Sequence, residues 1–121
     1  MSRILLVEDD PVTATILGRA LDQSGHDVEI AKNGLAAVEM LEGGGYGALI
    51  TDIMMPRLGG DELCRMVRAD ERYRDLPIFV TTGVIDPEKL SWIDSYHAVE
   101  VHTKPIRFAS LIERIDQLTA D

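Results

Sequence analysis

The chain is 121 residues long, with 45% hydrophobic and 5% aromatic residues, which is the size and composition of one globular domain. Its 21 acidic against 12 basic residues give a formal net charge of -9, which disfavours direct binding to nucleic acid. No apolar stretch approaches the roughly 20 residues that span a bilayer, and acidic residues directly follow the first short apolar run, unlike a secretory signal. We therefore expect a single cytoplasmic domain over residues 1–121, with neither nucleic acid nor a membrane as a direct partner.

Short apolar runs alternate with helix-like segments along the whole chain. The runs occupy residues 4–7, 26–31, 48–51, 78–80 and 99–101. Helices are expected over residues 11–25, from 33 or 34 to 43, over 60–69 and over 108–118, with a short one starting at Asp86 and Pro87. This alternation predicts an α/β fold with a parallel sheet and helices on both of its faces.

The patterns of the five runs predict their order in the sheet. Residues 4–7 and 78–80 are continuously apolar, as in strands buried on both faces. Residues 26–31 and 99–101 alternate apolar with polar side chains, which is typical of half-buried strands at an edge. With right-handed crossovers, the first, third and fourth strands are central and the doubly wound order is 2-1-3-4-5.

Apolar positions that recur every three or four residues are expected to face the sheet from its helices. They are Leu35, Val38 and Leu41 in the second helix, Leu63, Met66 and Val67 in the third, and Phe108, Leu111, Ile112, Ile115 and Leu118 in the last. The short fourth helix has a weak apolar face. Its Trp92 and Tyr96 are open to two interpretations, as anchors for a partner or as ordinary packing residues.

Four of the apolar runs lead directly to side chains that suit phosphoryl chemistry. Glu8 and Asp9 follow the first run, Asp52 the third, Thr82 the fourth and Lys104 the fifth. In a parallel sheet all of these groups emerge at the same carboxyl edge, where open α/β sheets bind ligands. Three converging carboxylates repel one another unless a cation neutralises them, and an all-oxygen set suits Mg²⁺. The pattern therefore predicts a magnesium site at this edge.

Asp52 is the predicted nucleophile of this site, because a carboxylate at the end of a central strand, followed by a loop, can be approached from solvent. It could attack an activated phosphorus and form an acyl phosphate. Lys104 would pair with one phosphoryl oxygen and the Thr82 hydroxyl would hydrogen-bond another. Alone, each residue is as easily explained as a helix cap, a turn residue or a solvated lysine; their joint placement favours the functional interpretation.

These motifs give the chain a resemblance to the receiver domain of bacterial two-component response regulators. The motifs are residues 4–10 (ILLVEDD), 52–56 (DIMMP) with the glycines at 59 and 60, 77–83 (PIFVTTG) and 104–105 (KP). The resemblance covers essentially the whole chain and implies a flavodoxin-like fold. It also implies that Asp52 is the phosphoacceptor, that Glu8, Asp9, Asp52 and the Met54 backbone carbonyl hold Mg²⁺, and that Thr82 is the switch hydroxyl.

The function implied by this resemblance is a phosphorylation-dependent signalling switch rather than an enzyme, catalysing only its own phosphorylation and dephosphorylation. A histidine kinase or a histidine phosphotransfer protein would supply the phosphoryl group. With no effector domain in residues 1–121, output would pass through the fourth helix, the fifth strand and the fifth helix to a downstream protein partner.

Three positions bear on how such a switch would work. Val101 stands where the family usually has an aromatic switch residue, and valine cannot make the inward or outward swing of such a ring. Met54 and Val84 lie two positions beyond Asp52 and Thr82, and neither side chain can orient a hydrolytic water. We therefore predict slow loss of the phosphoryl group and an output that does not use an aromatic rotamer.

Two alternatives remain open on the residues alone. A docking module with a receiver-like fold would never be phosphorylated, but it would have no physical need for this complete set of polar residues. A small-molecule aspartyl phosphatase or phosphotransferase would need a general acid beside its nucleophile, whereas apolar residues 53–55 follow Asp52.

Overall fold

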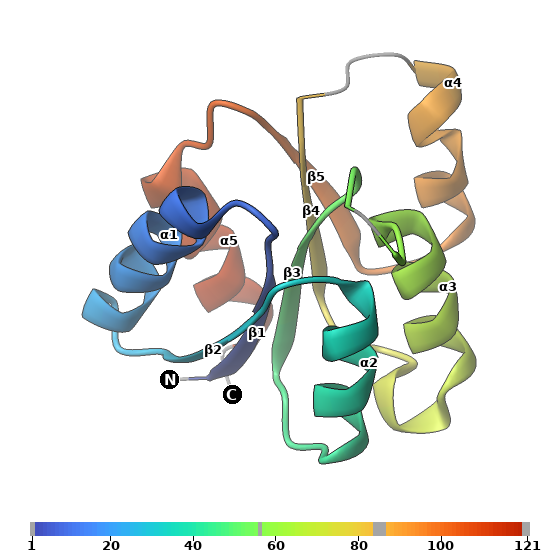
Figure 1. Cartoon of the computed structure of the whole chain (residues 1–121), viewed down its shortest axis with the longest axis horizontal. Helices are drawn as coiled ribbons and strands as arrows, with labels where there is room; N and C mark the ends of the chain where they lie inside the picture. Colours follow the sequence, from blue (N-terminus) through green and yellow to red (C-terminus); the bar gives the residue numbers. More distant parts are fainter. Residues whose placement is uncertain (1, 56, 84–86, 120–121) are drawn as a thin grey trace.

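Five parallel strands form one sheet in the computed structural model, which describes residues 2–55, 57–83 and 87–119. The strands are β1 (Arg3–Val7), β2 (Asp27–Ala31), β3 (Ala48–Asp52), β4 (Ile78–Thr82) and β5 (Val99–Thr103). The helices are α1 (Pro11–Gln23), α2 (Gly34–Glu42), α3 (Gly60–Ala69), α4 (Pro87–Leu90) and α5 (Phe108–Thr119). Figure 1 shows α1 and α5 on one face of the sheet and α2 and α3 on the other.

The strand order is β2-β1-β3-β4-β5, which confirms the predicted topology. All four neighbouring pairs are parallel. Every residue of β3 and β4 is buried, whereas β2 and β5 are partly exposed, as their alternating sequences predict. Because the strands are parallel, their carboxyl ends share one edge, at the top in Figure 1.

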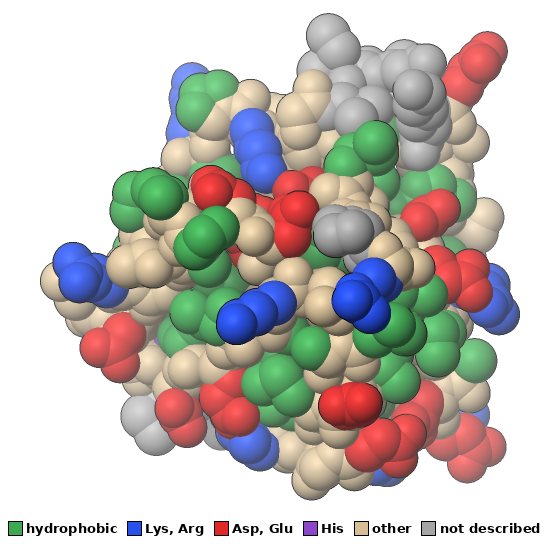
Figure 2. Space-filling model, in the orientation of Figure 1, with side chains coloured by type: hydrophobic (Ala, Val, Ile, Leu, Met, Phe, Trp, Pro, Cys, Tyr) green, Lys and Arg blue, Asp and Glu red, His purple; other side chains and the backbone are tan. Residues whose placement is uncertain are grey.

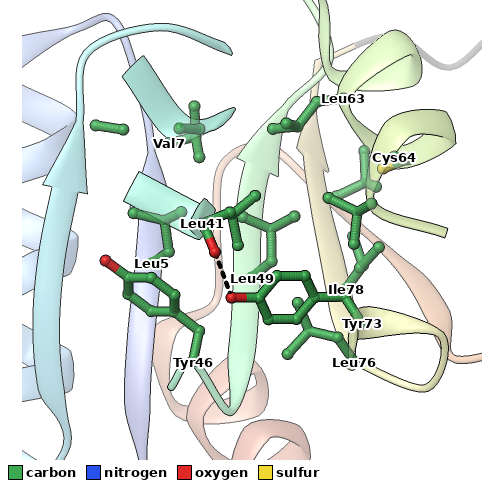
Figure 3. Close-up of a cluster of buried hydrophobic side chains, with 14 residues drawn as sticks. Leu5, Val7, Leu41, Tyr46, Leu49, Leu63, Cys64, Tyr73, Leu76 and Ile78 are labelled. Carbon is green, nitrogen blue, oxygen red and sulfur yellow. Dashed lines mark hydrogen bonds between the residues drawn. The ribbon is translucent and has the colours of Figure 1, made fainter. Parts of the chain in front are cut away.

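Two apolar layers hold the helices against the sheet, one on each face. Figure 3 shows the layer under α2 and α3, to which β1 contributes Leu5 and Val7. The alternate residues of β1, Ile4 and Leu6, point into the other layer, beneath α1 and α5. Within the layer of Figure 3 the buried Tyr73 hydroxyl donates a hydrogen bond of 2.6 Å to the carbonyl oxygen of Leu41.

Local sequence signals account for where the helices begin and end. The Asp10 carboxylate accepts a hydrogen bond of 3.2 Å from the Thr13 backbone N–H and so caps α1, with Pro11 at its first position. Asn33 caps α2 in the same way, through a bond of 2.8 Å from the Ala36 N–H. After α1 the chain turns at Gly25, whose φ of 94° lies in the left-handed region that glycine tolerates.

Three side chains expected to face the sheet are exposed, namely Leu35, Met66 and Leu118. In α2 the inward positions are Gly34, Ala37 and Leu41, so Leu35 lies about 100° away around the helix. In α3 Cys64 takes the inward place expected for Met66. Leu118 lies in the last turn of α5, beyond the buried Leu111 and Ile115.

The fourth helix is short, as its sequence predicts. α4 has four residues and is followed by a 3₁₀ turn, Ser91–Ser95. Asp86, expected to start it, lies outside the described residues. Trp92 packs against the layer under α2 and α3, and its ring meets Tyr96 edge to face at 6.3 Å, so packing accounts for much of its surface.

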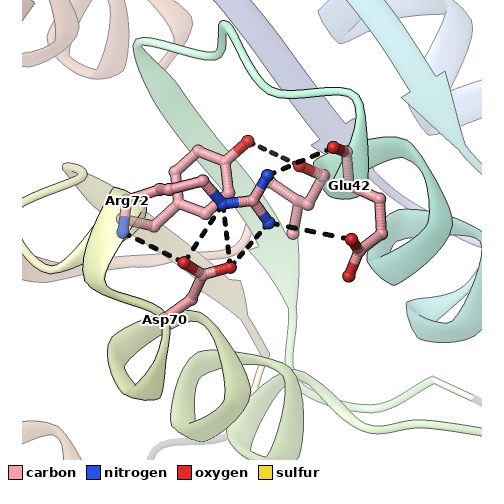
Figure 4. A network of polar contacts seen from close by, with 5 residues as sticks. Glu42, Asp70 and Arg72 are labelled. Carbon is pink, nitrogen blue, oxygen red and sulfur yellow. Dashed lines mark hydrogen bonds and ion pairs between the residues drawn. The ribbon is translucent and has the colours of Figure 1, made fainter.

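A polar network holds the connection after α3 at the amino edge of the sheet (Figure 4). Arg72 donates to the Asp70 carboxylate at 2.7 Å and to the Glu42 backbone carbonyl at 3.1 Å, and it stacks over the Tyr73 ring at 5.2 Å. These polar groups already pair with one another, so we interpret the network as stabilising the fold and not as a binding site. Across the described ranges, no helix combines the length and hydrophobicity needed to cross a membrane.

Candidate functional site

The residues predicted for the site come together at the carboxyl edge of the sheet. Asp52 is the last residue of β3 and Thr82 the last of β4. Glu8 and Asp9 follow β1, and Lys104 follows β5. The register places these ends level with one another, because Asp52 lies opposite Thr81 on β4. The topology therefore brings four separate parts of the sequence to one edge of the sheet.

Glu8, Asp9 and Asp52 form a carboxylate cluster. One oxygen from each lies within 4.8 Å of the others, which is the separation at which a single cation can be shared. Glu8 and Asp52 are 4% and 7% exposed, whereas Asp9 is open to solvent. Figure 2 shows acidic side chains close together in the upper middle of this face, beside a basic one, and others along its lower edge. Donors that are all oxygen, with one exposed side, fit Mg²⁺, which retains several waters.

Lys104 bridges this cluster from β5. Its Nζ donates a hydrogen bond of 2.7 Å to Asp52 Oδ2 and lies 3.6 Å from Glu8 Oε1. Partial burial disfavours the ammonium, but the hydrogen bond to Asp52 and the attraction of both carboxylates outweigh it and raise the pKa of Lys104. The lysine is therefore charged at neutral pH and neutralises part of the cluster.

Burial dominates the electrostatics of Glu8 and raises its pKa. The backbone N–H of Asp10, which donates to Glu8 Oε2 at 3.2 Å, opposes this shift, as does the charge of Lys104. The neighbouring carboxylates of Asp52 and Asp9 act in the same direction as burial. Negative charge is thus costly here, and a divalent cation would relieve that cost.

Asp52 is less open to solvent than expected. Lys104 covers Oδ2, and Oδ1 accepts a hydrogen bond of 3.2 Å from the Met54 backbone N–H. Both carboxylate oxygens are therefore held in a fixed orientation by groups on either side. The Met54 side chain is 69% exposed and lies at the rim of the site. The Met54 backbone therefore lies beside the Asp52 carboxylate.

A close approach between α3 and β3 fixes the start of this loop. The Gly60 N–H donates to the Ile53 carbonyl at 2.9 Å. A Cβ at Gly60 would overlap the Asp52 carbonyl oxygen and lie 2.9 Å from Ile53 Cα. Only glycine fits there, which gives a physical reason for the glycine in this motif.

Thr82 is fully buried, and its backbone carbonyl accepts a hydrogen bond of 2.8 Å from the Lys104 N–H. Val101 is partly buried on β5 opposite Val80. His102 packs on Phe79, in the layer under α1 and α5, with ring centroids 5.9 Å apart. Successive strand residues face opposite sides of a sheet, so His102 cannot take the place of Val101.

Comparison with known proteins places this geometry in a family. The model of the response regulator receiver domain matches residues 4–116. Response regulator MprA of Mycobacterium leprae is 38% identical over 117 residues, covering 96% of this chain and 50% of that protein. The chain spans about half the length of the curated relatives it matches.

Solved structures agree with this assignment. The receiver domain of a signal transduction histidine kinase from Syntrophus aciditrophicus is 29% identical, with a TM-score of 0.91 over 99% of this chain and 91% of that one. The receiver domain of sensor histidine kinase PA1611 from Pseudomonas aeruginosa, solved with magnesium in its active site cleft, is 28% identical. Its TM-score is 0.87, and the match covers 99% of this chain and 98% of that one. The chain belongs to the response regulator receiver domain family.

Proposed function

We propose that this receiver domain is a phosphorylation switch whose phosphoacceptor is Asp52. A histidine kinase or histidine phosphotransfer protein in the cytoplasm would present a phosphohistidine to the carboxyl edge of the sheet. A bond forms between an Asp52 carboxylate oxygen and phosphorus while the bond from phosphorus to the donor histidine nitrogen breaks. The observation that carries this proposal is the joint placement of Asp52, Glu8, Asp9 and Lys104 at one strand edge.

Glu8, Asp9, Asp52 and the Met54 backbone carbonyl are the proposed protein ligands of Mg²⁺. The carboxylate cluster, its burial and the raised pKa of Glu8 support this set, as does the magnesium held by the related receiver of PA1611. When bound, the metal offsets negative charge on the phosphoryl oxygens. The protein's own contribution is to hold Asp52 in place from both sides, through Lys104 and the Met54 N–H.

Lys104 and Thr82 are the proposed contacts of the phosphoryl group. Lys104 already lies beside Asp52, so it can exchange a carboxylate oxygen for a phosphoryl oxygen with a small movement. Thr82 ends the neighbouring strand β4, and its hydroxyl would bond another phosphoryl oxygen. These charge-assisted contacts exist only after phosphorylation, so they can favour a second conformation of the domain.

Output is proposed to pass through α4, β5 and α5 to a protein partner. To convert a mostly inactive population into a mostly active one, phosphorylation must stabilise the active conformation over the inactive one by about 5.5 kcal/mol. New charge-assisted contacts to the phosphoryl group can supply a large part of this free energy. Val101 has no ring to reorient, so the change would be transmitted by backbone and helix movement. The short α4 has four residues and continues directly into its 3₁₀ turn.

Intact mass spectrometry tests this proposal directly. Wild type and Asp52→Asn are incubated with Mg²⁺ and a small acyl phosphate. Wild type should gain one phosphoryl mass and Asp52→Asn none, and chelation of the metal should abolish the gain. A wild-type protein that stays unmodified while a receptive control receiver is labelled would favour a docking module.

A further inference from the structure

The start of α2 touches the loop that follows β3. Gly34, the first residue of α2, is buried beneath Leu58. A Cβ placed on Gly34 would overlap the Leu58 carbonyl oxygen and lie 2.6 Å from Leu58 Cβ. The φ of Gly34 is not in the left-handed region, so lack of space, and not backbone conformation, excludes a side chain here.

Leu58 has little room to retreat from this contact. It packs against the buried layer under α2 and α3. The far end of the loop is fixed at Gly60, whose N–H bonds to the Ile53 carbonyl and whose Cα lies against Asp52. The end of the loop that leads into α3 is therefore held both by the first turn of α2, at Leu58, and by the bond between Gly60 and Ile53.

This loop carries the groups that orient the proposed phosphoacceptor. Met54 donates its N–H to Asp52 Oδ1, and its carbonyl is the proposed fourth ligand of the metal. Mg²⁺ requires nearly ideal octahedral geometry, so a shift of this backbone by a fraction of an ångström weakens binding. Leu58 lies two residues before Gly60, whose N–H bonds to the Ile53 carbonyl, so a displacement of Leu58 would reach Ile53 and then the adjacent Met54.

We propose that Gly34 is a positioning residue for the metal and phosphoryl site, acting through Leu58 and the loop after β3. This inference rests on the proposed function, because it concerns the same site. Gly34 contacts neither metal nor phosphoryl group; its role is to leave the space that lets the loop lie close to α2.

The test is Gly34→Ala, with Gly18→Ala as the matched control. A Cβ at Gly18, inside α1, would lie 3.4 Å from the flexible end of Ile30, so that substitution adds the same methyl group without overlap. We expect Gly34→Ala to weaken Mg²⁺ binding by about tenfold, a size typical of residues that orient metal ligands. Gly18→Ala should bind Mg²⁺ as wild type does.

Phosphorylation by a small acyl phosphate separates positioning from a merely structural role. Gly34→Ala should be slow at low Mg²⁺ and recover towards the wild-type rate as Mg²⁺ is raised. Ile115→Val, in the buried layer under α5, destabilises the fold away from the site and should leave the Mg²⁺ affinity unchanged. Wild-type Mg²⁺ affinity in folded Gly34→Ala would overturn the inference.

A second pair of variants applies if Gly34→Ala does not fold. Leu58→Gly removes the Cβ that rests on α2, whereas Leu58→Ala keeps it. Weaker Mg²⁺ binding by Leu58→Gly than by Leu58→Ala supports the inference, and equal binding overturns it. The proposed function is tested separately, by wild type: if wild type neither binds Mg²⁺ nor accepts a phosphoryl group, that function fails first.

Discussion

Lys104 Nζ lies 2.7 Å from Asp52 Oδ2, so the ammonium group occupies a carboxylate oxygen that phosphorylation would use. The same group lies 3.6 Å from Glu8 Oε1. Lys104 therefore supplies the carboxylate cluster with a positive charge from the protein itself. Its removal should affect binding of the metal and transfer of the phosphoryl group differently.

Lys104→Met is expected to separate these two effects. Mg²⁺ affinity should stay within about threefold of wild type or increase, because a competing positive charge is lost. The rate of phosphorylation should fall by about tenfold or more, because no ammonium stabilises the phosphoryl oxygens. Calorimetry and labelling kinetics measure the two quantities, with Lys32→Met, at an exposed position before α2, as control. A parallel loss of Mg²⁺ affinity would show that Lys104 organises the carboxylates instead.

Met54 is expected to slow the loss of the phosphoryl group, since its exposed thioether side chain cannot orient water. Val84, the second residue in this prediction, lies outside the described residues. The phosphorylated protein should persist for many minutes in Mg²⁺, and Met54→Glu should shorten its half-life by about tenfold by activating water. The rate of phosphate release after removal of the donor measures the half-lives of wild type and Met54→Glu. A wild-type half-life of seconds contradicts the prediction.

The ion pair between β5 and α5 predicts a dependence of stability on pH. Arg114 donates hydrogen bonds to both Glu100 carboxylate oxygens and lowers the pKa of Glu100. A carboxylate whose pKa is lower in the folded than in the unfolded protein stabilises the fold at pH values above its unfolded-state pKa. This stabilisation is lost as the pH falls through the pKa of the folded state. Wild type should therefore be more stable than Glu100→Gln at neutral pH, and the difference should close in acid.

Urea unfolding from pH 7 to pH 3 measures this difference. Glu39→Gln, at an exposed position on α2, is the control and should show no comparable change with pH. A constant difference between wild type and Glu100→Gln across the whole range would mean that the Glu100–Arg114 pair contributes no pH-dependent stability.

Tyr73→Phe is expected to destabilise the protein without disturbing the site. The substitution leaves the buried Leu41 carbonyl without the hydroxyl that now donates to it at 2.6 Å, which costs about 1 kcal/mol. Because Tyr73 lies at the lower end of the layer of Figure 3, towards the amino edge of the sheet and away from the site, phosphorylation should proceed at the wild-type rate. Chemical denaturation and labelling kinetics test the two parts, and an altered labelling rate would reveal coupling to the site.

The sequence predicts the sheet order well, because strands buried on both faces and strands buried on one face have different patterns of apolar and polar residues. Residues 78–80 are continuously apolar in central β4, whereas Glu100 and His102 interrupt the apolar residues of edge strand β5. Helix faces were predicted less well. Leu35 is expected inside because it is large and apolar, but the buried positions of α2 are Gly34, Ala37 and Leu41, and Gly34 lies against Leu58.

The candidate site was predicted by which residues end the strands, and the structure brings those residues together. What a linear sequence cannot show is how they are held. The coverage of Asp52 by Lys104 and Met54 depends on the path of the loop. That path depends in turn on the contact of Gly34 with Leu58 and of Gly60 with the end of β3. A glycine signals a possible close approach, but not its partner.

Mapping the phosphorylated residue tests the central claim most directly. Wild type is incubated with Mg²⁺ and a small acyl phosphate, and borohydride then reduces any acyl phosphate to homoserine before peptide mass spectrometry. We expect homoserine at position 52 alone, and none when Mg²⁺ is chelated. Homoserine at Asp9 or Asp10 with Asp52 unchanged, or no homoserine at any position, would contradict it.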